Sequence, residues 1–226
     1  MKTLYLFPGL GADETIFRKL HLPGYEIVHI KWIKPLNKET LPEYAKRLVY
    51  QIRKDTEPVL IGLSFGGMVA QEVAKIIDPA LTIIISSIKT YHERPFQMIL
   101  AEKLGVSRFI PTRLAIEFEF WYYWAFGPTT RMEKAFIKQM ALNVHPDFTD
   151  WAAHTAISWR NEELVPNVVH IHGDRDNLFP HWYIRNFILI KGGTHFMVYN
   201  RADEVAAIIL DKLSKLEEKQ QYRMAV

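Results

Sequence analysis

The sequence predicts an α/β fold, in which a mostly parallel sheet of about six strands is covered by helices on both faces. Two observations predict this class. Short apolar runs alternate with segments of helical periodicity at both ends of the chain. Several of these runs are almost continuously apolar and rich in β-branched residues, which is typical of strands buried on both faces. A third observation, the absence of a strand pattern over residues 90–160, predicts a helical insertion.

The expected strands are apolar runs that end near glycine, proline or a polar turn. They cover residues 3–7, 26–31, 59–63, 81–86, 167–172 and 187–190. Helices are expected over residues 41–54, from Ser64 to Ile77, near 180–186 and over 201–219. Thr40 and Glu43 form a capping-box pattern at the start of the first helix, and Asp78-Pro79 ends the second.

These elements divide the chain into a core and an insertion. The core is expected to comprise residues 1–89 and 161–226, and residues 90–160 are expected to form a helical lid between two strands. Strand–helix alternation stops at the first boundary and resumes at the second. A chain of 226 residues is long enough for this arrangement in one domain.

Composition narrows the possible functions. The chain has no cysteine, which rules out disulfides and thiolate nucleophiles and fits a cytoplasmic location. The net charge of +3 is small and scattered, so we expect no nucleic-acid partner. No apolar run is long enough for a membrane span. The start MKTLYLFPGLGADE has some features of a signal peptide, but Pro8-Gly9 breaks its apolar run.

The stretch VLIGLSFGGMVAQEVA, residues 59–74, places a serine between glycines where a strand meets a helix. Gly62-x-Ser64-x-Gly66 in that context is the pattern of a nucleophile elbow. The glycines let neighbouring backbone pass close to the turn, and the turn holds the serine hydroxyl out for reaction. A tight turn with an incidental serine is the alternative.

A serine hydroxyl needs a general base, which a third group must orient. Residues 168–180, VVHIHGDRDNLFP, offer Asp174 and Asp176 after an apolar strand. Residues 187–196, FILIKGGTHF, offer His195 after the next one. His170 and His172 lie on the preceding strand and share one face of it, so we interpret them as core or sheet-edge histidines.

Four motifs in this order make the chain similar to the α/β-hydrolase superfamily: FPGLG (7–11), GLSFGG (62–67), HGDRD (172–176) and GGTHF (192–196). The resemblance covers nearly the whole chain outside residues 90–160. It implies that Ser64 is the nucleophile, His195 the general base and acid, and Asp176 the orienting carboxylate. Asp176 is preferred over Asp174 because the acid loop of the family typically reads Gly-x-x-Asp.

The resemblance also implies an oxyanion hole made of two backbone N–H groups. Phe65, directly after the nucleophile, should supply one, and Leu10 in the first loop should supply the other. Relatives often have His-Gly-x-Gly in that loop, where this chain has Pro8-Gly9-Leu10-Gly11. Because the chain begins at the strand before this loop, it is expected to lack the two N-terminal strands of larger relatives.

Aromatic residues in the expected lid are candidates for a substrate pocket. The segment EFEFWYYWAFGP, residues 117–128, is the richest, and Met68 follows the elbow. The candidate pocket residues are Met68, Trp121, Tyr122 and Trp124. Trp151, His154 and Trp159 form a second set of this kind. The alternative for both sets is packing of the lid against the core.

The sequence thus predicts a serine hydrolase that cleaves a small or medium apolar ester or thioester through an acyl-enzyme. It predicts no cofactor and no metal site, and a small apolar molecule as the partner. Carbon–carbon bond hydrolysis and acyl transfer with the same three residues remain open. A hydrolase-like fold that only binds a small ligand is the non-enzymatic alternative.

Overall fold

The computed structural model describes residues 2–53, 57–105 and 119–225. Its centre is a six-stranded sheet in the order β2-β1-β3-β4-β5-β6. Every neighbouring pair in it is parallel. The strands are β1 (Thr3–Phe7), β2 (Glu26–His29), β3 (Val59–Leu63), β4 (Leu81–Ile85), β5 (Val168–Gly173) and β6 (Ile188–Ile190). The predicted fold class, a parallel α/β sheet with helices on both faces, is confirmed.

Helices connect these strands. The α-helices are α1 (Leu41–Leu48), α2 (Phe65–Ile77), α3 (Phe96–Lys103), α6 (Glu119–Phe126), α7 (Arg131–Asn143), α8 (Pro146–Ser158), α9 (Met197–Asn200) and α10 (Ala202–Ala225). Short 3-10 helices are η1 (Glu14–Phe17), η2 (Val49–Gln51), η3 (Tyr91–Glu93) and η4 (His181–Tyr183).

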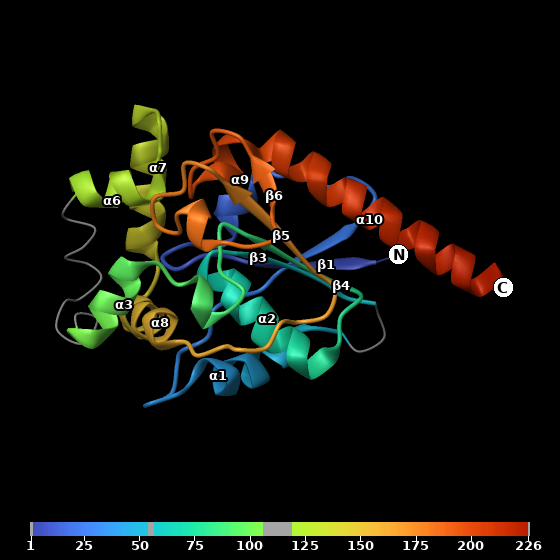
Figure 1. The fold of residues 1–226 in the computed structure, drawn as a ribbon, viewed down its shortest axis with the longest axis horizontal. Helices are drawn as coiled ribbons and strands as arrows, with labels where there is room; N and C mark the ends of the chain where they lie inside the picture. The colour runs from blue at the N-terminus through green and yellow to red at the C-terminus, as the bar shows by residue number, and fades with distance from the viewer. Residues whose placement is uncertain (1, 54–56, 106–118, 226) are drawn as a thin grey trace.

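The sheet is the middle of three layers (Figure 1). Along β1, Leu4 and Leu6 pack on one face with the apolar side of α10, whereas Tyr5 and Phe7 pack on the other with α1 and α2. This alternation is the two-residue period of a strand. All four side chains are buried, so the sheet separates two apolar cores.

The connection from β4 to β5 contains α3, α6, α7 and α8. Figure 1 shows these helices gathered at the end of the sheet away from the chain's N-terminus. Because every strand runs parallel to β1, this is the edge where all the strands end. Ligands of open α/β sheets bind at that edge. Part of the predicted lid, residues 106–118, lies outside the described residues, and the boundaries 90 and 160 stay a prediction.

Two helix ends differ from the sequence prediction. The helix expected over 41–54 gives way to η2 after Leu48, because Ile52 turns to an extended conformation and is buried in the core. The last helix passes residue 219 and continues to Ala225, since its final turns contain good helix formers and no glycine or proline. Within the described residues, no helix combines the length and apolar character that crossing a membrane requires.

Candidate active site

The turn between β3 and α2 holds Ser64 in a conformation rare for a residue with a side chain, at φ 53° and ψ −120°. A Cβ atom at Gly62 would lie 2.4 Å from the carbonyl oxygen of Gly66. At Gly66 it would lie 2.2 Å from the carbonyl oxygen of Pro8. Only glycine fits at either position, so the turn and the loop after β1 pack backbone against backbone.

Backbone and side-chain hydrogen bonds hold this turn in place. The Ser64 N–H donates to the carbonyl oxygen of Ile85 at 2.8 Å. The Ser87 hydroxyl donates to the carbonyl oxygen of Ser64, also at 2.8 Å. Both partners lie at the end of β4, so the neighbouring strand fixes the position of the serine.

The structure brings Ser64, His195 and Asp176 together at the edge where the strands end. Ser64 Oγ lies 2.9 Å from His195 Nε2, and His195 Nδ1 lies 2.8 Å from Asp176 Oδ2. All three residues are buried. The pairing with Asp176 requires the proton on Nδ1, which leaves the lone pair of Nε2 free to accept the serine proton.

The surroundings of Asp176 keep it ionised. Burial alone would raise the pKa of its carboxyl group, but interactions with His195, His172 and the Phe179 N–H outweigh burial and lower that pKa. Oδ1 accepts the N–H groups of Leu178 at 3.0 Å and Phe179 at 2.8 Å. The carboxylate is therefore fixed through both oxygens.

Asp174, the other acid considered from sequence, does not contact His195 by any hydrogen bond among the described residues. Its carboxylate accepts the N–H of Gly192, which has φ 75° and begins the turn before His195. Asp174 therefore has the turn-stabilising role that aspartate often has in loops.

Two backbone N–H groups close to Ser64 have no acceptor among the described residues. Phe65 is the first residue of α2, where an N–H has no partner within the helix. The Leu10 N–H is likewise unpaired, although the loop is closed by an Ala12 N–H bond to the carbonyl oxygen of Gly9. A Cβ atom on Gly9 would lie 3.5 Å from Ser64 Cβ, so this loop contacts the serine directly.

The sequence model of the alpha/beta hydrolase family matches residues 5–208, which include the turn, the acid loop and His195. The chain belongs to the alpha/beta hydrolase family.

Solved structures share the fold of this alpha/beta hydrolase at low sequence identity. A bromoperoxidase from Bacillus anthracis has a TM-score of 0.72 at 18% identity, over 94% of this chain and 92% of that chain. An esterase from Exiguobacterium antarcticum has a TM-score of 0.71 at 15% identity, over 96% and 92%. A thermophilic esterase from Thermogutta terrifontis has a TM-score of 0.66 at 19% identity, over 96% and 90%. No curated protein sequence matches the chain.

Two aromatic side chains flank His195 in this alpha/beta hydrolase. The Phe126 ring meets the imidazole edge to face, with ring centroids 5.3 Å apart. The Phe179 ring lies 5.5 Å away. They give the imidazole an apolar environment, in which hydrogen bonds to it are strengthened. Phe179 is not among the predicted site residues. Phe126 belongs to the aromatic segment expected to line a pocket, but no sequence signal distinguishes it from its neighbours as the ring that contacts His195.

The end of α6 is attached to both loops that carry His195 and Asp176. The Asn177 amide donates to the carbonyl oxygen of Trp124 at 2.8 Å. The Thr194 hydroxyl donates to the carbonyl oxygen of Gly127 at 3.2 Å. Each contact comes from a residue next to one of the candidate catalytic groups, so α6 is positioned by the acid and base loops.

The predicted pocket residues lie in different surroundings. Met68 is fully buried in the core on the α1–α2 side. Tyr122 is partly buried, contacts the Phe126 ring and donates its hydroxyl to the carbonyl oxygen of Ile137. Trp124 is about half exposed, and the side chain of Trp121 lies outside the described part of the chain. Their assignment to a substrate pocket stays a prediction.

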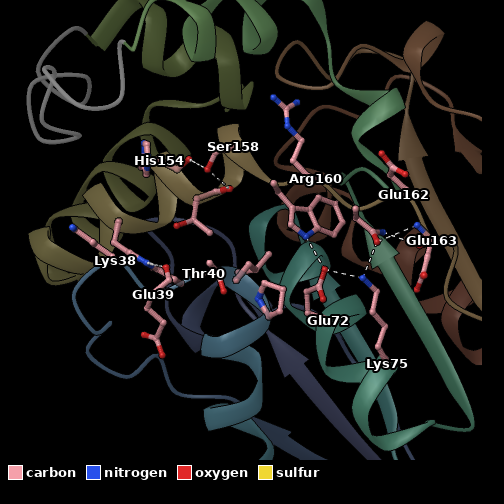
Figure 2. Close-up of a pocket in the computed structure, with 16 residues that line it drawn as sticks. Lys38, Glu39, Thr40, Glu72, Lys75, His154, Ser158, Arg160, Glu162 and Glu163 are labelled. Carbon is pink, nitrogen blue, oxygen red and sulfur yellow. Dashed lines mark hydrogen bonds and ion pairs between the residues drawn. The ribbon is translucent and has the colours of Figure 1, made fainter.

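A cavity of about 840 Å³ opens between α1, α2, α8 and residues 159–163 (Figure 2). Trp151, His154 and Trp159, the second aromatic set, line it, but Ser64, Asp176 and His195 do not. The Glu72 carboxylate lies 2.9 Å from the Lys75 ammonium group, an ion pair drawn as a dashed line in Figure 2. It also accepts the N–H of the Trp159 indole at 2.8 Å. Glu72 is two turns along α2 from Ser64, about 12 Å at the rise of an α-helix, so this cavity is separate from the candidate active site.

A second cavity, of about 360 Å³, lies beside the loop after β1. Pro8, Trp32 and Phe148 contribute to its wall, together with charged side chains that include Lys31 and Asp147. Pro8 also packs against Gly66 in the turn that carries Ser64. Ser64, Asp176 and His195 do not line this cavity, and Pro8 is its link to the turn that carries the serine. Among the described residues, no group of three or more histidine, aspartate or glutamate side chains is arranged to hold a metal ion.

Proposed function

We propose that this alpha/beta hydrolase is a serine hydrolase that cleaves a small or medium apolar carboxylic ester or thioester. The hydrogen-bonded series from Ser64 Oγ through His195 to Asp176 carries the proposal, with separations of 2.9 and 2.8 Å. Such spacing suits a nucleophile, its general base and the group that orients the base. The unpaired N–H groups of Leu10 and Phe65 add a place for a developing oxyanion.

The proposed reaction has two halves. Ser64 Oγ attacks the substrate carbonyl carbon while His195 Nε2 takes the serine proton. The resulting oxyanion accepts hydrogen bonds from Leu10 and Phe65, and His195 then protonates the departing alcohol or thiol. Water next attacks the acyl-enzyme with His195 as base, which releases a carboxylic acid and restores Ser64. Asp176 stabilises the imidazolium that forms in each half.

The apolar substrate class is supported by the surroundings of His195. The rings of Phe126 and Phe179 flank the imidazole and make its surroundings apolar. The cavity beside Pro8 supports only the small size of the substrate, because its volume is at the lower end for small-molecule pockets and charged side chains form part of its wall. The remaining expectations, a cytoplasmic location and no nucleic-acid partner, rest on composition and stay predictions.

A series of p-nitrophenyl esters with acyl chains of increasing length tests this function. We expect hydrolysis well above the uncatalysed rate, with a maximum at a short or medium chain. The kcat of the Ser64→Ala variant should fall roughly 10³-fold or more, with a small residual activity above the uncatalysed rate. Background rates for the wild type across the whole series would contradict ester hydrolysis and favour carbon–carbon bond cleavage, acyl transfer or simple binding.

A further inference from the structure

A row of buried polar side chains continues from Asp176 into the protein, away from Ser64. His172 Nε2 lies 3.8 Å from Asp176 Oδ2. His172 Nδ1 lies 3.2 Å from His170 Nε2, and His170 Nδ1 lies 3.2 Å from Lys89 Nζ. Glu93 Oε1 lies 3.0 Å from the same ammonium group. All five residues are buried.

The hydrogen-bond partners determine where each proton in this row lies. The Lys89 ammonium has only donors, so His170 Nδ1 must accept from it. His170 therefore carries its proton on Nε2 and donates to His172 Nδ1. His172 in turn carries its proton on Nε2, which faces the carbonyl oxygen of Phe179 at 2.7 Å. With its proton on Nδ1 instead, His172 would place the lone pair of an unprotonated Nε2 against that carbonyl oxygen.

Lys89 is suited to this role because its three protons each have an acceptor: His170 Nδ1, Glu93 Oε1 and the carbonyl oxygen of Arg185. Glu93 is fixed as well, since it accepts the N–H groups of Arg185 and of Lys89. A buried ammonium is tolerated when it is paired and fully hydrogen-bonded. The row thus begins at a satisfied ion pair.

The other end of the row holds the acid loop. His172 fixes the carbonyl oxygen of Phe179, and the N–H of the same residue donates to Asp176 Oδ1. We propose that Lys89, His170 and His172 are positioning residues: they form a proton-ordered relay that holds the Asp176 loop, and through it His195, in the geometry for catalysis. This inference rests on the proposed serine hydrolase function.

Both imidazoles must be neutral for the relay to work. Burial lowers the pKa of His170, and the neighbouring His172 and Lys89 lower it further. Burial also lowers the pKa of His172; His195 acts in the same direction, while Asp176, Glu93 and the Phe179 carbonyl act against it. The groups that face the pair therefore leave each ring with a single proton near neutral pH.

Nitrogen NMR of protein labelled with ¹⁵N-histidine tests the proton order without using activity. We expect His170 and His172 to give the pattern of a neutral ring protonated on Nε2, unchanged from about pH 6 to 8, the range in which an unperturbed histidine titrates. A ring protonated on Nδ1, or a ring that becomes charged in this range, would overturn the proposal.

Three variants test the positioning role. His172→Gln keeps a donor for Phe179 and should retain kcat within about threefold, whereas His172→Met removes it and should lower kcat about 10- to 100-fold with KM nearly unchanged. Lys89→Met combined with Glu93→Gln removes the ion pair without leaving a lone charge and should lower kcat about three- to tenfold. In this double variant His170 should no longer be held in the one tautomer that has its proton on Nε2.

Equal kcat for His172→Met and the wild type would overturn the relay. Equal losses of kcat in the methionine and glutamine variants would overturn it as well, because a packing defect alone predicts no rescue by glutamine. If the methionine variant does not fold, the glutamine variant and the NMR pattern still decide. Covalent labelling of Ser64 by an active-site probe tests the proposed function separately. If Ser64 is labelled but kcat does not change when His172 is replaced, only the relay is contradicted and the serine hydrolase function stands.

Discussion

At the scale of single residues, the two aspartates of the HGDRD loop have different surroundings. Asp176 accepts the His195 N–H, whereas Asp174 accepts only the Gly192 N–H among the described groups. We expect Asp176→Asn to lower kcat/KM by roughly 10⁴-fold, because asparagine favours the wrong imidazole tautomer. Asp174→Asn is the matched control, since its amide oxygen can still accept the Gly192 N–H. Steady-state kinetics that showed equal losses would contradict the assignment of the acid.

The buried histidine pair predicts a pH dependence of stability. The pKa of His170 and of His172 is lowered in the folded protein, so below about pH 6.5, the usual pKa of histidine, the unfolded chain binds protons that the folded chain does not. The free energy of unfolding should therefore fall with decreasing pH, by up to about 1.4 kcal/mol per unit for each ring.

Urea unfolding at pH 7, 6 and 5.5 measures this dependence. His172→Gln should show a smaller fall than the wild type, because one titrating ring has been removed and the pKa of His170 is lowered less without it. Parallel curves for the two proteins would show that His172 is not held neutral by the fold.

At the scale of elements, the turn between β3 and α2 depends on how closely two backbones approach. Gly66→Ala would force a Cβ atom against the carbonyl oxygens of Phe7 and Pro8, at 2.3 and 2.2 Å. We expect it to cost about 1–3 kcal/mol of stability, as overpacking does. The variant should also lose activity, by more than its loss of stability explains, because the displaced loop carries Leu10.

Gly24→Ala is the control for this substitution. Unlike Gly66, Gly24 has a positive φ, of 85°, and its Cβ would meet no atom within 4 Å. It should cost about 1 kcal/mol through backbone strain and leave kcat unchanged. Thermal melts and ester kinetics on both variants provide the comparison, and full activity in Gly66→Ala would argue against the oxyanion loop.

The strands were predictable because buried parallel strands read as apolar runs, and β1 and β3 have the bounds that the sequence predicts. The order of Ser64, Asp176 and His195 was predictable for a related reason, since each follows a strand. The contacts of Phe126, Asn177 and Lys89 could not be predicted from the sequence. They depend on how α6 and the segment after β4 pack against loops far away in sequence, which no local pattern encodes.

At the scale of the whole molecule, α6 and the sheet meet at the acid and base loops. Asn177→Ala removes the hydrogen bond to the Trp124 carbonyl oxygen. One exposed hydrogen bond contributes about 0.5–1.4 kcal/mol, so we expect KM for the preferred ester to rise about two- to tenfold. Gln139→Ala, which removes a surface bond within α7, is the control. An unchanged KM for Asn177→Ala would show that α6 does not shape the site.

The central claim is that Ser64 is an activated nucleophile, and a fluorophosphonate probe tests it most directly. The probe reacts with a serine hydroxyl only when a base has activated it. We predict one covalent adduct per wild-type chain, located on Ser64 by peptide mass spectrometry, and no adduct on Ser64→Ala. An unlabelled wild type, or equal labelling of both proteins, would contradict the account.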